Sequence, residues 1–243
     1  MNMKGIILAG GQGTRLRPLT YVTNKQLLPV YNKPMIYYPL NTLLKAGIKN
    51  ILIISGPDKI GDFSDLLGSG RKLGAKISYE IQDEPRGLAE AFILGEDFIG
   101  KSNVAMILGD NIFEDDFSEE LKNFKSGGKI FLKKVSDPER FGVAELNSRG
   151  GIKKIVEKPK KHISDQAITG LYVYDSRSVE IAKNIKPSSR GELEIVDIHN
   201  WYLKNNELDY TKVKGKWLDV GTFDSLLQAQ NFAKEKMQGK MVI

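Results

Sequence analysis

The chain of 243 residues is long enough for one large domain or two small ones and needs no covalent cross-links to build a hydrophobic core. Its 41% hydrophobic and 27% charged residues are typical of a globular protein, and the lack of cysteine excludes disulfides and thiolate chemistry. No apolar run approaches 18 residues and no secretory leader is recognisable, so we expect no membrane span and a cytoplasmic location.

The formal net charge of +6 comes from scattered lysines rather than from one basic run. A net positive charge is typical of proteins that bind nucleic acid, but it is equally typical of proteins with a pocket that attracts small polyanions. Aromatic residues are not interleaved with the basic clusters, as a stacking platform for single strands would require. We therefore expect small anionic substrates and no nucleic-acid partner.

Apolar strands alternate with helical patterns through the first half of the chain, which predicts an α/β fold with a mostly parallel sheet between helices. The second half has more strands and fewer helices, which predicts a more mixed lobe. The expected strands are Lys4–Ala9, Ile51–Ile54, Lys76–Ile81, Val104–Leu108, Ile130–Val135, Gly142–Glu145, Ile152–Glu157 and Gly170–Tyr174. The expected helices are Pro34–Ala46, Asp58–Leu67, Gly87–Leu94, Phe117–Phe124, Leu193–Leu203 and Phe223–Met237.

The first strand opens directly into a glycine-rich loop, Gly10–Pro18, which carries the cation Arg15 and is soon followed by Lys25. Backbone N–H groups in such a loop can face phosphate oxygens. The loop lacks the G-x-x-x-x-G-K-[ST] string of a Walker loop, and Leu16 stands where a dinucleotide fingerprint needs its third glycine. An ordinary tight turn is the plainer interpretation of the glycines, but the two cations favour a nucleoside triphosphate.

Two further loops are expected at the same edge of the sheet as the glycine-rich loop. These are Gln82–Gly87 and Gly109–Asn111, and both follow predicted strands. In open α/β sheets ligands bind beyond the carboxyl ends of the strands, so the three loops together predict the functional site.

Motifs spread along nearly the whole chain resemble those of the sugar nucleotidyltransferases. They are Gly10–Pro18, Asn24–Val30, Lys33–Leu40, Gly87–Ala89, Leu108–Asn111, Phe141–Val143, Val156–Pro159, Thr169–Tyr172, Arg190–Ile195 and Trp217–Thr222. The resemblance implies a Rossmann-like fold with a mixed sugar-binding lobe. It also implies the reaction of an NTP with a sugar 1-phosphate to give an NDP-sugar and pyrophosphate. The chain is most similar to the branch that uses dTTP and glucose 1-phosphate with Mg²⁺.

The resemblance implies a single domain over residues 1–243, with a nucleotide-binding part at about 1–125 and a sugar-phosphate-binding part at about 126–243. Two anions must meet for the sugar phosphate to attack the α-phosphorus in line, so charge neutralisation and positioning dominate. Arg15, Lys25 and Asp110 are the implied catalytic residues. The implied nucleotide-binding residues are Leu8, Gly10, Gly11, Gly13, Thr14, Arg15, Gln26, Gln82, Gly87 and Asp110.

Asp110 and Asp219 are the implied Mg²⁺ ligands, in keeping with the preference of that ion for one or two carboxylates plus phosphates. From the residues alone, each aspartate could instead cap a turn or a helix. The implied sugar-phosphate residues are Gly142, Glu157, Lys158, Tyr172 and Arg190. Without the resemblance, Gln82 would be an exposed loop residue and Tyr172 a core aromatic. The two histidines, His162 and His199, receive no role.

Two departures from the family pattern qualify these expectations. Asn32 stands at a turn position where the family usually has aspartate, and asparagine suits a turn equally well. The chain also ends soon after the last predicted helix, where longer members continue with a helical region; we expect a short form without a regulatory nucleotide site, as a possible homo-oligomer (dimer or tetramer).

Other functions stay open from the sequence alone. The same chemistry with UTP or another sugar 1-phosphate is a close alternative, because thymine and uracil differ by one methyl group. A non-catalytic nucleotide-sugar sensor is an alternative of another class.

Overall fold

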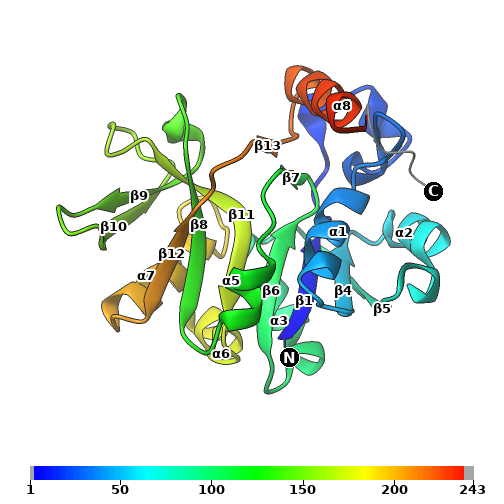
Figure 1. Ribbon diagram of the computed structural model, residues 1–243. Helices are drawn as coiled ribbons and strands as arrows, with labels where there is room; N and C mark the ends of the chain where they lie inside the picture. The colour runs from blue at the N-terminus through cyan, green and yellow to red at the C-terminus, as the bar shows by residue number, and fades with distance from the viewer. Residues whose placement is uncertain (1–2, 238–243) are drawn as a thin grey trace.

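The computed structural model describes residues 3–237, and within them nine strands form one twisted sheet with helices on both faces (Figure 1). The strand order is β10-β9-β11-β6-β1-β4-β5, and β8 joins by pairing with β11 and β12. The strands are β1 (Met3–Leu8), β4 (Asn50–Ser55), β5 (Lys76–Ile81), β6 (Asn103–Leu108), β8 (Gly128–Lys134), β9 (Gly142–Leu146), β10 (Ile152–Glu157), β11 (Gln166–Tyr174) and β12 (Leu208–Lys212).

The first-half strands β5, β4, β1 and β6 are all parallel, and β1 lies in their centre. In β1, Gly5 pairs with Ile51 on one side and with Ala105 on the other. The strand is buried on both faces, which explains its nearly unbroken apolar sequence. The loops that follow these four strands therefore lie along one edge of the sheet.

The second half extends the same sheet with mixed pairing. Strand β11 is antiparallel to β6, β8 and β9, whereas β12 is parallel to β8. The register of β11 against β8 shifts between Ile168 and Tyr172. The predicted fold, a mostly parallel sheet with flanking helices and a mixed second lobe, is confirmed.

Helices cover both faces of the sheet with one hydrophobic core on each, and a third, smaller core includes Leu226 and Phe232 of the last helix. On one face, Phe92 of α3, Ile181 of α6 and Tyr202 of α7 are buried, and on the other Leu40 of α1 and Phe63 of α2. The helices are α1 (Tyr37–Lys45), α2 (Ile60–Leu67), α3 (Glu90–Leu94), α4 (Glu96–Ile99), α5 (Ser118–Asn123), α6 (Arg177–Asn184), α7 (Ile195–Lys204) and α8 (Phe223–Met237). None of the helices between residues 3 and 237 combines the length and the apolar character needed to cross a bilayer.

Several predicted boundaries are wrong for local reasons. The helix expected from Pro34 begins at Tyr37, because Pro29–Val30 (β2) and Lys33–Pro34 (β3) form a small hairpin around Tyr31, whose φ is 60°. The helix expected from Gly87 begins at Glu90. Helix α6, strand β12 and the short strands β7 (Asn111–Phe113) and β13 (Trp217–Asp219) were not predicted.

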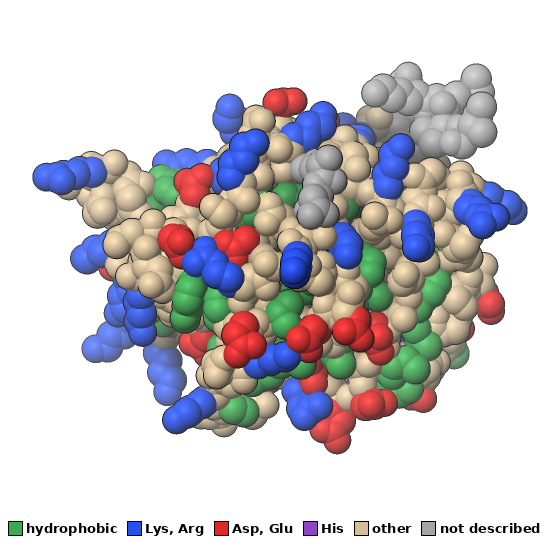
Figure 2. Space-filling model, turned by 90° about the horizontal axis from the view of Figure 1, so that it is seen from below, with side chains coloured by type: hydrophobic (Ala, Val, Ile, Leu, Met, Phe, Trp, Pro, Cys, Tyr) green, Lys and Arg blue, Asp and Glu red, His purple; other side chains and the backbone are tan. Residues whose placement is uncertain are grey.

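The face at the amino ends of the parallel strands carries both signs of charge. Figure 2 shows Lys and Arg side chains interspersed with Asp and Glu over this face, without one continuous basic surface. A mixed surface of this kind lacks the one-sided positive field that nucleic-acid binding requires.

Candidate functional site

Two adjoining cavities lie at the carboxyl edge of the parallel strands, and both are lined by Leu88, Leu108 and Glu192. The small cavity has a volume of about 220 Å³ and the large cavity about 570 Å³. The small cavity is lined by the predicted nucleotide residues Leu8, Gly10, Gly11, Gln26, Gln82, Gly87 and Asp110. The large cavity is lined by all five predicted sugar-phosphate residues, Gly142, Glu157, Lys158, Tyr172 and Arg190, together with Arg15 and Asp219.

Gly87 fixes the rim of the small cavity. Its φ of +106° disfavours any other residue, and a Cβ built there would lie 2.4 Å from the carbonyl oxygen of Leu193. The neighbouring backbone is held by two hydrogen bonds, from Ala89 N to Leu193 O (3.1 Å) and from Leu193 N to Arg86 O (2.7 Å). The loop after β5 is thereby tied to the segment that leads into α7.

The two glutamines of the small cavity are both buried, at 2% exposure for Gln26 and 7% for Gln82. The Nε2 of Gln82 donates to Glu90 Oε2 at 2.8 Å. The Oε1 of Gln26 is buried without a hydrogen-bond partner, whereas its backbone N–H donates to Asn24 Oδ1 at 2.8 Å. An unpaired buried acceptor costs about 1–3 kcal/mol, so a ligand donor at this atom would be favoured.

Asp110 lies just after β6 and Gly109 and lines the small cavity, whereas its neighbour Asn111 lines the large one. Its Oδ2 forms an ion pair with Lys25, and its Oδ1 accepts a hydrogen bond from Asn111 Nδ2 at 3.0 Å. Asn111 is fixed in turn, because its Oδ1 accepts from Trp217 Nε1 at 2.6 Å and from Gly170 N at 3.0 Å. The carboxylate is therefore oriented by groups from three different parts of the chain.

The small sheet of β7 and β13 brings Asp219 beside Asp110. Asp219 pairs with Asn111 across this antiparallel ladder, and Val220 N donates to Asp110 O at 3.0 Å. Burial, and next the charge of Asp110, raise the pKa of Asp219, while Lys25 and two arginines oppose the rise. Two carboxylates that disfavour each other's charge suit a shared cation. The described residues hold no group of three or more such metal-ligating side chains.

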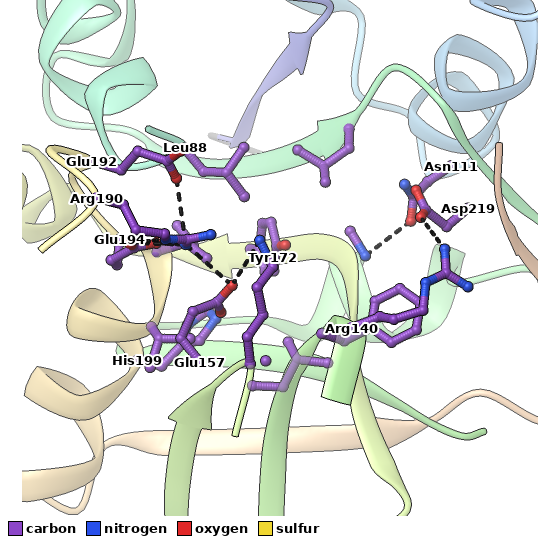
Figure 3. A pocket seen from close by; sticks show the side chains of 18 of the residues that line it. Leu88, Asn111, Arg140, Glu157, Tyr172, Arg190, Glu192, Glu194, His199 and Asp219 are labelled. Atoms are coloured by element: carbon purple, nitrogen blue, oxygen red, sulfur yellow. Dashed lines mark hydrogen bonds and ion pairs between the residues drawn. The ribbon is translucent and has the colours of Figure 1, made fainter. Parts of the chain in front are cut away.

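Arg15 and Arg140 bring cations to this carboxylate pair. A Cβ built on Gly221 would lie 2.8 Å from Arg15 Nη2, so the guanidinium packs closely on this backbone. Arg140 Nη2 lies 3.8 Å from Asp219 Oδ2, and its Nη1 lies 2.6 Å from Asp137 Oδ2 (Figure 3). Arg140 was not predicted, although it directly precedes the motif Phe141–Val143.

Both carboxylates and cations line the large cavity (Figure 3). Arg190 Nη2 lies 2.9 Å from Glu194 Oε2 and 3.6 Å from Glu157 Oε1. Burial raises the pKa of Glu157, which Lys158 and Arg190 partly offset. Lys158 has a φ of 40°, an uncommon backbone conformation for a residue other than glycine. The cavity thus offers a half-buried carboxylate beside two cations.

The remaining predicted residues lie outside the two cavities. Lys25 lines a third cavity of about 400 Å³, which it shares with Gly11 of the small cavity. Gly13 precedes the short helix η1 (Thr14–Leu16) in a left-handed conformation, and Thr14 is exposed. Neither Gly13 nor Thr14 lines any of the three cavities.

Comparison with known proteins identifies the family. The model of the nucleotidyl transferase family matches residues 4–236. The chain belongs to this family.

Relatives of this nucleotidyl transferase share close to half of its residues. A glucose-1-phosphate thymidylyltransferase of Neisseria meningitidis is 52% identical, over 96% of this chain and 83% of that protein. One of Mycobacterium tuberculosis is 49% identical, over 99% of this chain and 86% of that protein.

Solved structures share the fold of the chain over almost its whole length. A Bacillus anthracis protein assigned as a glucose-1-phosphate thymidylyltransferase, crystallised with sucrose, has a TM-score of 0.91 at 50% identity and covers 96% of both chains. A UDP-glucose pyrophosphorylase complexed with UDP-glucose has a TM-score of 0.84 at 26% identity, over 97% of this chain and 100% of that one.

Proposed function

We propose that this nucleotidyl transferase joins dTTP to glucose 1-phosphate, giving dTDP-glucose and pyrophosphate. The observation that carries the proposal is the adjacency of the two cavities, with Asp110 on the small one beside Asp219 on the large one. The choice of both substrates is supported by two relatives named glucose-1-phosphate thymidylyltransferase, which are 52% and 49% identical to this chain. A cytoplasmic location is proposed with the reaction, since dTTP is an intracellular nucleotide.

The small cavity is proposed to hold the nucleoside. A glutamine amide donates and accepts at once, as the imide edge of thymine requires, and this role is assigned to Gln82. The unpaired Oε1 of Gln26 offers an acceptor to a sugar hydroxyl of the nucleotide. Leu8 and the backbone at Gly87 bound the space for the base. The glycine-rich loop, with Gly10, Gly11, Gly13 and Thr14, is assigned to the phosphates.

The large cavity is proposed to hold the sugar phosphate. Glu157 accepts hydrogen bonds from sugar hydroxyls, because a carboxylate is an acceptor. Lys158 and Arg190 pair with the 1-phosphate, because cations bind phosphate oxygens strongly. Gly142 lies against this carboxylate, because a Cβ there would be 3.1 Å from Glu157 Oε2. Tyr172 is 4% exposed and forms part of the wall.

In the reaction, a phosphate oxygen of glucose 1-phosphate forms a bond to the α-phosphorus of dTTP while the bond to the departing pyrophosphate breaks in line. Arg15 neutralises charge on the departing group, and Lys25 does so nearer the attacked phosphorus. Lys25 would exchange its partner Asp110 for phosphate oxygens when the triphosphate enters.

Asp110 and Asp219 are proposed to hold Mg²⁺. Their oxygen donors suit this hard cation, and the pKa of Asp219 is raised by burial and then by the neighbouring charge of Asp110, which a bound cation would offset. When bound, the ion supplies charge neutralisation for the triphosphate. Arg140 would hold Asp219 in place from the side of the large cavity.

The two parts of the chain are proposed to act as one domain over residues 1–243. Strand β11 of the sugar-phosphate part pairs directly with β6 of the nucleotide part, so the sheet runs unbroken through the junction. The adjacency of the two substrates then depends on a rigid sheet rather than on a hinge.

The proposal is tested by comparing Asp110→Asn with Asp209→Asn, an exposed carboxylate on β12 that pairs with Lys129. Product formation from dTTP and glucose 1-phosphate is followed by mass spectrometry, and dTTP binding by calorimetry. We expect Asp110→Asn to retain dTTP binding and lose at least about 100-fold in turnover, with Asp209→Asn unchanged. Full activity of Asp110→Asn overturns the metal and catalytic assignments. Binding without turnover by the unmodified protein would favour the sensor alternative.

A further inference from the structure

His199 is a buried residue of the large cavity that has an unused hydrogen-bonding atom. It lies on α7, one turn after Val196, and both residues line the cavity (Figure 3). Its side chain is 0% exposed, and its Nδ1 lies 2.7 Å from Tyr174 OH. Its Nε2 is buried and has no hydrogen-bond partner. Leaving such an atom unpaired costs about 1–3 kcal/mol, which a hydrogen bond to a bound ligand would offset.

The imidazole ring packs against two tyrosine rings. Its centroid lies 5.4 Å from the ring of Tyr172 and 6.0 Å from that of Tyr174. Tyr174 is itself packed between Phe92, at 5.4 Å, and Tyr202, at 5.5 Å. Tyr202 OH donates to Asp175 Oδ1 at 2.8 Å, which anchors the stack. These neighbours therefore orient the ring before any ligand enters.

The charge state of His199 limits what it can bind. Burial lowers its pKa to about 3, so the ring is neutral near pH 7. A neutral imidazole is a poor partner for phosphate, which has Lys158 and Arg190 in the same cavity. One of its nitrogens donates and the other accepts, and a hydroxyl group can serve either role.

We propose that His199 binds glucose 1-phosphate by a hydrogen bond between Nε2 and one hydroxyl of the hexose. This inference rests on the proposed function and adds a residue that reads the sugar. It assigns the sugar hydroxyls to two side chains of different elements, the carboxylate of Glu157 on β10 and the imidazole of His199 on α7. A sugar that lacks the matching hydroxyl leaves Nε2 unpaired and binds less well.

The test compares Tyr174→Phe with the double variant Tyr174→Phe/His199→Phe, so that no buried hydroxyl is left without its histidine. Each is assayed with dTTP and glucose 1-phosphate, and then with the monodeoxy derivatives of glucose 1-phosphate, each lacking a different hydroxyl. Ser178→Ala is the matched control, because its buried Oγ also lacks a partner but lies on α6 outside the cavity.

We expect the added His199→Phe change to raise the KM for glucose 1-phosphate by about two- to tenfold, the value of one hydrogen bond. The KM for dTTP stays within about twofold, and Ser178→Ala behaves as the unmodified protein. For one monodeoxy derivative the added change has no effect, which identifies the hydroxyl.

Two results overturn the role of His199: an equal loss with every sugar phosphate, which means a structural role, or no loss with any. Circular dichroism and a melting curve confirm that both variants are folded. If the unmodified protein turns over no sugar phosphate, the proposed function fails and the inference falls with it. Turnover with a uniform loss overturns the inference alone.

Discussion

Lys25 and Asp110, which are 85 positions apart in the chain, form an ion pair that links the third cavity, lined by Lys25, to the small cavity, lined by Asp110. Both side chains are largely shielded, at 14% and 13% exposure. A triphosphate would compete for Lys25, and a metal ion would compete for Asp110. The pair therefore holds both groups in position until the substrates replace each partner.

Replacing Lys25 by methionine should reduce kcat/KM by about 100- to 1,000-fold, because one positive group near the attacked phosphorus is lost. Steady-state kinetics with dTTP and glucose 1-phosphate measures the change. Lys59→Met is the control, since Lys59 lines the third cavity together with Lys25, and of the two only Lys25 pairs with Asp110. A loss below about threefold for Lys25→Met would contradict the assigned role.

Gln26→Met should weaken dTTP binding by about tenfold without lowering the free energy of unfolding by more than about 0.5 kcal/mol. The reason is that Gln26 Oε1 has no partner to lose in the free protein. Asn24→Ala gives the opposite pattern, because its side chain accepts from Gln26 N and donates to Ala9 O. Calorimetry and urea unfolding separate the two effects, and equal destabilisation by both variants would contradict the account.

Much of the fold could be predicted because the parallel strands are buried on both faces and read as short apolar runs. Strand β5 was predicted with its observed bounds, Lys76–Ile81. Helix α1 was expected three residues too early, since Pro34 suits the first turn of a helix as well as a hairpin. The strands β7 and β13 were not predicted because each is only three residues long and forms through its pairing with the other, which lies far away in the sequence.

The candidate site could be predicted where a motif followed a strand, as with Asp110 after β6. His199 and Arg140 could not be found in this way, for different reasons. His199 looks like a residue of an amphipathic helix, and its unused Nε2 exists only because the stacked tyrosines fix the ring. Arg140 can be assigned to the site only through its contact with Asp219, which lies far along the chain.

Gly87→Ala should lower the free energy of unfolding by about 2 kcal/mol or more and raise the KM for dTTP. The new Cβ would meet the backbone of Leu193, which cannot move aside as a flexible side chain can. Gly74→Ala is the matched control, because Gly74 has a φ of +70° with open space around it, and it should cost only about 1 kcal/mol. An equal loss of unfolding free energy in the two variants would show that the close approach of Leu193 to Gly87 has no effect on stability.

The stability of the protein should fall in mild acid because of His199. Its pKa is about 3 in the folded protein and about 6.5 for a histidine in an unfolded chain, so below pH 6.5 the unfolded chain binds a proton that the folded chain does not. Between about pH 7 and pH 5 this group alone should lower the free energy of unfolding by about 2 kcal/mol.

Urea unfolding at the two pH values checks this prediction. The loss should be smaller by that amount in Tyr174→Phe/His199→Phe than in Tyr174→Phe. An identical pH dependence with and without His199 would show that the ring is not kept neutral by burial.

The most direct test of the central claim is pyrophosphate release by the purified protein with Mg²⁺. Each of dTTP, UTP, CTP, GTP and ATP is paired with glucose 1-phosphate and with several other sugar 1-phosphates. The account predicts the highest kcat/KM for dTTP with glucose 1-phosphate, exceeding that for UTP by about five- to 200-fold if the cavity reads the methyl group. Faster release with another pair, or none from folded protein that binds dTTP, would contradict it.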